Sequence, residues 1–341
     1  FRILCLEEPE AHLHPAMQYK LFKFLKKMDD DHNLNQQIFV TTHSPNITAV
    51  AGLDNMYMMA YERNDPIPDC TQQSLKSQFS GDSDAQKHMM KFLDVTRSDM
   101  LFADKVIFVE GIAEKLLLPK FLEKCGYAYE DEHISIVEVG GKNFPYFVRA
   151  FVNNPVKKKV LCVTDCDFNW SFSNGAKTVA DYKLYKPSHV EMLRTEFSTA
   201  TNLKTVFQKC YGSTFEDDLY MCNIGNAKVA KKLLKIAMPK SLHPYIDTCR
   251  LNFDRWDRNR GQIPTKSKDK VCKIIDDIKA AIALHPENAL YYKGLFFAKL
   301  FYAYVENKKG DMALSILVDE ALMKEPKVPP YIREGIEWLS M

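Results

Sequence analysis

The sequence predicts an α/β protein with a parallel sheet in its middle and helices added towards its C-terminal part. From about residue 100 to 165, apolar runs of four to six residues alternate with helical patterns. Such a run is typical of a buried parallel strand. After residue 188 the pattern is mostly helical. A length of 341 residues fits two or three domains better than one.

Composition excludes several classes of protein. The net charge is only +2, so no global basic field indicates nucleic-acid binding. The nine cysteines form no C-x-x-C pair, which argues against a disulfide framework or zinc knuckle and fits a reducing, cytoplasmic setting. No apolar stretch approaches the roughly 20 residues that span a bilayer, so we expect no membrane partner. The sequence opens inside a strand pattern without Met, so we expect the later part of a longer protein.

Residues 1–64 predict the order strand, helix, strand, helix, strand. The strands are expected at 3–6, 37–42 and 55–61, and an amphipathic helix at 17–28. Residues 65–85 are polar and rich in Asp, Ser, Gln and Pro, which predicts a linker or long loop.

Residues 100–165 predict the order β-α-β-α-β. The strands are expected at 105–110, 133–139 and 159–164, and the helices at 113–124 and 144–152. Strands that alternate with helices in this way form a parallel sheet with helical crossovers.

Four carboxylates follow two of these strands. Glu110 ends the first strand and Glu114 lies one helical turn further on, on the same helix face. Asp165 and Asp167 follow the third strand, where alternate positions of an extended chain share a face. Functional residues gather at this edge of a parallel sheet, and clustered carboxylates repel one another unless cations lie between them. Hard divalent ions accept such ligands, and two ions about 4 Å apart can stabilise phosphodiester cleavage. The sequence therefore predicts a metal-dependent enzyme.

Residues 3–15 read I-L-C-L-E-E-P-E-A-H-L-H-P and resemble the Walker B strand and D-loop of ABC-type ATPases, in particular the SMC/Rad50-like branch. The resemblance implies that Glu7, where the family usually has Asp, helps to hold Mg²⁺ and that Glu8 polarises the attacking water. T-T-H-S-P at 41–45 resembles the H-loop, which implies that His43 reaches the γ-phosphate. No G-x-x-x-x-G-K-S/T motif or ABC signature segment occurs. We therefore expect half an ATPase site, with ATP bound only by the full-length protein.

Residues 105–167 resemble the Toprim fold of topoisomerases, primases and OLD-type nucleases. The resemblance implies that Glu110, Asp165 and Asp167 hold Mg²⁺ or Mn²⁺, as one ion or, more in keeping with the chemistry, two. It also implies that Glu114 is the further acid of the OLD type.

Two later segments extend this resemblance. E-N-K-K-G-D-M-A at 306–313 resembles the end of OLD Toprim domains, whose essential lysine in a K-G-x-x-A context points to Lys309, with Lys308 as the alternative. A cation there can stabilise the charge of the reacting phosphate. T-F-E-D-D-L at 214–219 resembles a family segment whose acid is linked to the second metal, which implies Glu216.

The order of these motifs resembles the OLD family of ATPase–Toprim nucleases, which includes the Gabija nuclease subunit and retron-associated effectors. On this resemblance, residues 1–95 are the C-terminal part of an ABC/SMC-like ATPase domain with a linker. Residues 96–341 are then a Toprim nuclease domain with a helical insertion at about 190–300.

Membership in that family implies Mg²⁺- or Mn²⁺-dependent cleavage or nicking of DNA, nucleotide control, self-association and a role in anti-phage defence. It also brings in a helicase or a reverse transcriptase as a candidate partner. Two other classes stay open: a Toprim strand-passage or primase-like enzyme, and a non-catalytic SMC-like ATPase scaffold.

Overall fold

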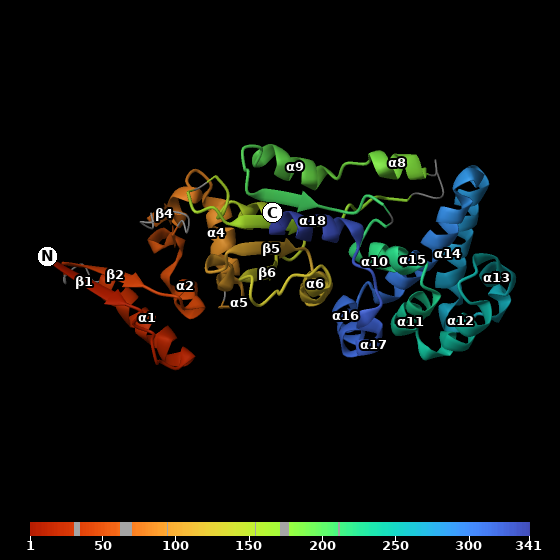
Figure 1. The fold of residues 1–341 in the computed structure, drawn as a ribbon, viewed down its shortest axis with the longest axis horizontal. Helices are drawn as coiled ribbons and strands as arrows, with labels where there is room; N and C mark the ends of the chain where they lie inside the picture. The colour runs from red at the N-terminus through yellow and green to blue at the C-terminus, as the bar shows by residue number, and fades with distance from the viewer. Residues whose placement is uncertain (31–34, 62–69, 94, 154, 171–176, 211) are drawn as a thin grey trace.

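The computed structural model describes residues 1–30, 35–61, 70–93, 95–153, 155–170, 177–210 and 212–341. The molecule is elongated, with the N-terminal strands at one end, a larger sheet in the middle and a group of helices at the other end (Figure 1). No helix in this described part is long and apolar enough to cross a membrane.

At the N-terminal end, strands β1 (Arg2–Glu7) and β2 (Gln36–Thr41) pair in parallel. Helix α1 (Pro15–Asp29) begins at a proline, which is pre-organised for a first helical turn, and covers one face of this pair. A small core forms there around Phe22, Leu25 and Ile47, the last from α2 (Pro45–Ala51).

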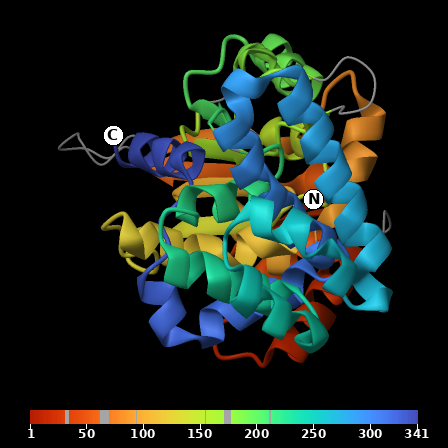
Figure 2. The same ribbon diagram turned by 90° about the vertical axis from the view of Figure 1, so that its right-hand side faces the viewer.

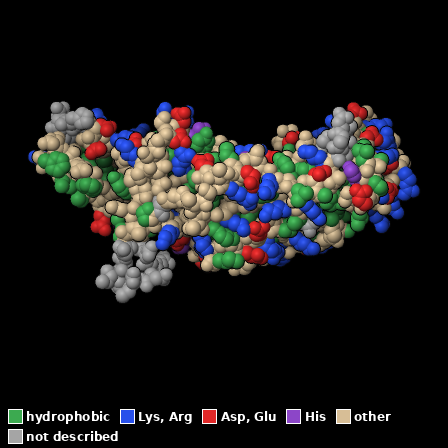
Figure 3. Space-filling view, turned by 90° about the horizontal axis from the view of Figure 1, so that it is seen from above, with side chains coloured by type: hydrophobic (Ala, Val, Ile, Leu, Met, Phe, Trp, Pro, Cys, Tyr) green, Lys and Arg blue, Asp and Glu red, His purple; other side chains and the backbone are tan. Residues whose placement is uncertain are grey.

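The opposite face of the pair is exposed. Ile3 and Phe39 are 61% and 52% exposed, and Cys5 lies directly opposite Phe39 in the register. Figure 3 shows hydrophobic side chains gathered at this end of the molecule. The described part of the N-terminal unit is therefore a thin layer that is packed on one side only.

The loop predicted at 65–85 is wrong where the structure describes it; residues 65–69 lie outside the described residues. Strand β4 (Cys70–Ser74) pairs antiparallel with β3 (Tyr57–Tyr61), and α3 (Leu75–Gln78) and α4 (Ser83–Phe92) follow. The Ser and Asp residues that suggested a loop are helix caps: Ser74 accepts from Ser77 N and Asp82 accepts from Ala85 N.

The central sheet has four parallel strands in the order β6-β5-β7-β8. The three predicted strands are confirmed as β5 (Lys105–Val109), β6 (Ile134–Glu138) and β7 (Lys159–Val163). The fourth, β8 (Leu203–Val206), pairs with β7 and was not predicted, because it is a four-residue edge strand with only Val206 fully buried.

Each face of this sheet has its own core. Helix α6 (Ile112–Lys124), α18 (Pro330–Ser340) and most C-terminal helices share one of them. Helix α18 lies close against β7, where a Cβ on Gly335 would come within 2.9 Å of the Leu161 side chain. The other core joins α4, α7 (Phe144–Val148) and α9 (Ser188–Glu196) to the strands and contains buried residues from 53 to 101. A domain division at residue 95 stays a prediction, and this shared core favours an earlier point.

The remaining helices gather in front of the sheet when the molecule is viewed from its end (Figure 2). They are α8 (Val179–Leu184), α10 (Phe215–Asn223), α11 (Ala227–Ala237), α12 (His243–Cys249), α13 (Phe253–Arg258), α14 (Thr265–Leu284), α15 (Ala289–Val305), α16 (Lys309–Val318) and α17 (Glu320–Lys324). Helix α5 (Val95–Ser98) lies apart from this group and packs on α2. Helix α15 is buried along most of its length and packs on α10, α11 and α14, while α16 packs on α6. This packing brings the first turns of α10 and α16 to the carboxyl edge of the sheet.

Candidate metal centre at the carboxyl edge of the sheet

Glu110 joins the ends of three strands. Its Oε1 accepts hydrogen bonds from Asp165 N at 2.9 Å and from the hydroxyl of Thr164, and its carbonyl accepts from Gly141 N at 3.0 Å. The carboxylate after β5 is thus tied to the backbone after β7 and the loop after β6. The geometry follows from the parallel register, which ends β5, β6 and β7 at one edge.

Glu114 lies in the first turn of α6 and is only 4% exposed. Its Oε2 is buried and accepts no hydrogen bond from the described residues. Burial, followed by the nearby charge of Glu216, raises the pKa of Glu114 to about 8. Gly111 lies beside this carboxylate, since a Cβ there would come into van der Waals contact with Oε2 at 3.4 Å. A cation bound at Oε2 would supply the partner that this carboxylate lacks.

Asp165 is also buried, at 7% exposure. Burial, and then the charges of Glu114, Glu216 and Glu110, raise its pKa well above the ordinary value. Its Oδ1 accepts a hydrogen bond from Gln208 Nε2 at 2.7 Å. The acids at the ends of β5 and β7 therefore face one another, as the sequence predicted.

Glu216 and Lys309 complete the cluster from the helical part of the chain. Glu216, in the first turn of α10, has a fully buried side chain, and Lys309 Nζ lies 3.0 and 3.1 Å from its two carboxylate oxygens. Burial raises the pKa of Glu216 against the opposing charge of Lys309. Burial lowers the pKa of Lys309, but the charge of Glu216 outweighs this and the net shift is upward. Lys308 is exposed at the helix N-cap, so it is Lys309 that contacts the acids.

Asp167 lies apart from this cluster. Its side chain is 42% exposed and makes an ion pair of 2.5 Å with Lys142. The backbone at Asp167 is left-handed, with φ of 52°, and its N–H donates to Ser213 O at 2.9 Å. The extended chain that would place both aspartates on one face is therefore not seen, and Asp167 lies at the rim beside Lys142.

Two side chains near the acids were missed from the sequence. Lys142 follows two glycines in the left-handed region after β6. The G-G-K sequence at 140–142 is the signal that could have indicated it. His189 is half-buried and lies 3.0 Å from the Thr164 hydroxyl through Nε2. Burial, followed by the charge of Lys142, lowers the pKa of His189. No spacing rule connects it to the acids.

The donor chemistry fits a hard divalent ion in type, since every acid here offers carboxylate oxygens. The unpaired Oε2 of Glu114 and the raised pKa of Asp165 both indicate that the ionised forms of these acids lack a counter-ion here. In the described ranges, however, no three His, Cys, Asp or Glu side chains are arranged to hold one ion. Ligation would require these side chains to turn towards one point.

The N-terminal motif forms a second, exposed group. Glu7 and Glu8 are exposed, and His43 Nε2 lies 3.3 Å from Glu8 Oε1. Glu10 was missed: it is 9% exposed and accepts from Thr42 Oγ1 and from His43 N, the latter at 3.1 Å. Glu10 thus ties the end of β1 to the end of β2 and holds His43 beside Glu8. The sequence signal that could have indicated Glu10 is its place as the third acid of the E-E-P-E segment at 7–10.

Two family models match the chain. Residues 101–167 match the Toprim domain of proteins like the overcoming lysogenization defect (OLD) protein, and residues 2–48 match an AAA ATPase domain. The chain is 30% identical over 146 residues to Endonuclease GajA of Bacillus cereus (strain VD045), covering 43% of this chain and 23% of that protein. It is 28% identical over 138 residues to the OLD nuclease of Thermus scotoductus, covering 40% and 26%. These matches support a likeness of this chain to the ATPase–Toprim nucleases of the OLD family.

A second GajA, from Bacillus cereus (strain HuB5-5), aligns over 374 positions at 21% identity, covering 99% of this chain and 48% of that protein. The chain therefore spans about half or less of the length of the curated relatives it matches. Among solved structures, the C-terminal region of the Burkholderia pseudomallei OLD protein aligns at 19% identity with a TM-score of 0.37, covering 70% of this chain and 98% of that one.

Proposed function

We propose that this chain carries the nuclease centre of a divalent-metal-dependent DNA endonuclease or nickase. The observation that supports this most is the convergence of Glu110, Glu114, Asp165 and Glu216 with one lysine at the carboxyl edge of the sheet. Glu110, Glu114 and Asp165 lie within the segment matched by the OLD-like Toprim model. The names of the relatives, an endonuclease and a nuclease, agree with the proposal.

Mg²⁺ or Mn²⁺, most simply as two ions, would be held by the four clustered acids together with Asp167 once Lys142 releases it. When bound, such ions stabilise charge on the attacking and leaving oxygens of a phosphodiester. Lys309 would act beside them, because its ammonium is held in place by Glu216 and can bind the non-bridging oxygens of the phosphate. Since Glu114 has a pKa of about 8, metal binding at neutral pH should release a proton.

Supercoiled plasmid distinguishes this function from its alternatives. We expect nicked or linear product with Mg²⁺ or Mn²⁺ and no product with EDTA. Relaxed closed circles would instead indicate a strand-passage enzyme, and unchanged plasmid would indicate a non-catalytic scaffold. Glu123→Gln, an exposed change on the far end of α6, is the matched control and should cleave like the wild type.

For the N-terminal unit we propose a part of an ATPase site in which Glu7 helps to hold Mg²⁺, Glu8 positions water and His43 contacts the γ-phosphate. The 3.3 Å approach of His43 to Glu8 supports this grouping, and the ABC/SMC-like type stays part of the proposal. In the full-length protein, nucleotide would then control cleavage by a self-associating cytoplasmic nuclease used in anti-phage defence.

A further inference from the structure

The segment after β8 supports the loop that carries both aspartates. Strands β7 and β8 stay paired up to Val163 and Val206, and Thr164 N then donates to Val206 O at 3.1 Å. The two chains therefore leave the sheet side by side. Gln208, Gly212 and Ser213 contact the loop of Asp165 to Asp167, although more than 40 residues separate the two segments in sequence.

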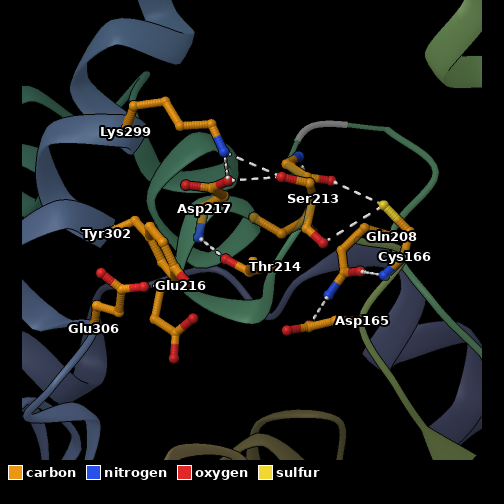
Figure 4. Close-up of polar contacts among 12 residues, drawn as sticks. Asp165, Cys166, Gln208, Ser213, Thr214, Glu216, Asp217, Lys299, Tyr302 and Glu306 are labelled. Atoms are coloured by element: carbon orange, nitrogen blue, oxygen red, sulfur yellow. Dashed lines mark hydrogen bonds and ion pairs between the residues drawn. The ribbon is translucent and has the colours of Figure 1, made fainter. Parts of the chain in front are cut away.

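Gln208 makes the closest contacts in this segment. It is 1% exposed. Its Oε1 accepts from Cys166 N at 2.7 Å, and its Nε2 donates to Asp165 Oδ1 at 2.7 Å (Figure 4). A primary amide can accept and donate at once, whereas a carboxylate or an apolar side chain cannot make both bonds.

The same segment also holds the second aspartate and is itself anchored. Ser213 O accepts the N–H of Asp167 at 2.9 Å. The Ser213 hydroxyl donates to Asp217 Oδ2 at 3.1 Å, and Lys299 of α15 contacts both side chains (Figure 4). The support for the D-x-D loop thus extends into the helical part of the molecule.

We propose that Gln208 is a positioning residue for the metal centre, fixing the Asp165 carboxylate through Oδ1 and leaving Oδ2 for a cation. Asp165 lies among like charges, so without this donor its carboxylate gains by turning away from Glu114 and Glu216. Residues that hold metal ligands by hydrogen bonds commonly change metal affinity about 10–100-fold when they are replaced. This inference rests on the proposed function, because it requires Asp165 to bind a metal ion.

A purely structural role is the competing explanation, since Gln208 also holds the backbone N–H of Cys166. A matched control separates the two. Asn202 lies at the opposite end of β8, and its Nδ2 donates to Phe151 O at 2.8 Å and to Lys158 O at 2.7 Å. Asn202→Leu removes two hydrogen bonds of similar length from the same strand pair without touching the acids.

The test measures Mn²⁺ binding to the full chain by titration calorimetry, unfolding temperature in EDTA, and plasmid nicking against Mn²⁺ concentration. Gln208→Met, which has nearly the same shape, should weaken Mn²⁺ binding about 10–100-fold and raise the half-saturating Mn²⁺ concentration equally. Asn202→Leu should lower the unfolding temperature comparably and leave Mn²⁺ affinity within about twofold. Gln208→Asn keeps an amide but is one methylene shorter, so it should also lose affinity, and it decides the case if the Met variant does not fold.

Mn²⁺ affinity within about twofold of wild type in a folded Gln208 variant overturns the inference while the proposed function stands. A loss of affinity in Asn202→Leu equal to that in Gln208→Met overturns it as well, because destabilisation alone would then explain both. A wild-type chain that neither binds Mn²⁺ nor cleaves plasmid removes the proposed function, and the inference with it.

Discussion

Glu114→Gln should stabilise the metal-free protein, and only at high pH. Glu114 is 4% exposed, and its pKa is raised from 4.5 to about 8, first by burial and then by Glu216. A carboxyl whose pKa is higher in the folded state binds more protons when folded. Stability is therefore lost as pH rises from about 4.5 to about 8. Glutamine carries no charge and avoids this loss.

The magnitude follows from the shift. A rise in the pKa of Glu114 from 4.5 to about 8 corresponds to a penalty of roughly 5 kcal/mol on the ionised form. The amide remains a buried polar group with incomplete hydrogen bonding, which costs about 1 kcal/mol. We therefore expect Glu114→Gln to raise the free energy of unfolding by up to about 4 kcal/mol at pH 8.5. At pH 5, where the wild-type carboxyl is already protonated, the gain should vanish or become slightly negative.

Urea unfolding in EDTA at pH 5, 6.5 and 8.5 measures this difference. Glu123→Gln, on the same helix but exposed, is the control and should change stability by less than about 0.5 kcal/mol at each pH. Mn²⁺ should reverse the order at pH 8.5, because the wild type keeps a ligand that the variant has lost. A variant that is less stable than wild type at pH 8.5, or a gain that does not depend on pH, would refute the reasoning.

Three further outcomes are expected from the same cluster. Asp165→Ala should abolish plasmid cleavage because it removes a proposed metal ligand. The thermal unfolding midpoint should hold or rise, because the same change removes a buried acid. Retained cleavage would count against the assignment. Lys309→Ala should slow single-turnover cleavage. It should also lower the free energy of unfolding in urea by about 3–5 kcal/mol, since Glu216 is left buried without its partner. Adding Glu216→Gln should recover much of that stability. Lys142→Gln should tighten Mn²⁺ binding up to about fivefold by calorimetry, because an exposed ion pair competing for Asp167 is worth at most about 1 kcal/mol; weaker binding would show that Lys142 supports the site.

The central strands could be predicted because burial on both faces demands unbroken apolar runs, and β5 and β7 each have four fully buried residues in succession. The edge strand β8 could not be predicted by the same rule, since Lys204 and Thr205 are polar and only partly buried. The capping residues of α3 and α4 were misread because Ser and Asp favour both turns and helix starts.

The residues of the candidate site likewise divide into those that could be placed from the sequence and those that could not. Glu110, Glu114 and Asp165 could be placed from strand ends and helical spacing alone. Asp167 could not, because a left-handed backbone at that position has no marker in a non-glycine residue. The role of Gln208 could not be predicted from the sequence, because it depends on which strand pairs with β7. Its contacts join segments more than 40 residues apart.

The two-stranded layer at the N-terminal end affects how any measurement of stoichiometry should be interpreted. Its strands have unpaired outer edges among the described residues, and Ile3 and Phe39 lie on its open face. Such edges readily add strands from other molecules. Dimers or larger species of this chain could therefore form by adventitious strand addition at β1 or β2. Light scattering of a Phe39→Lys variant beside the wild type would separate adventitious strand addition from a genuine subunit interface.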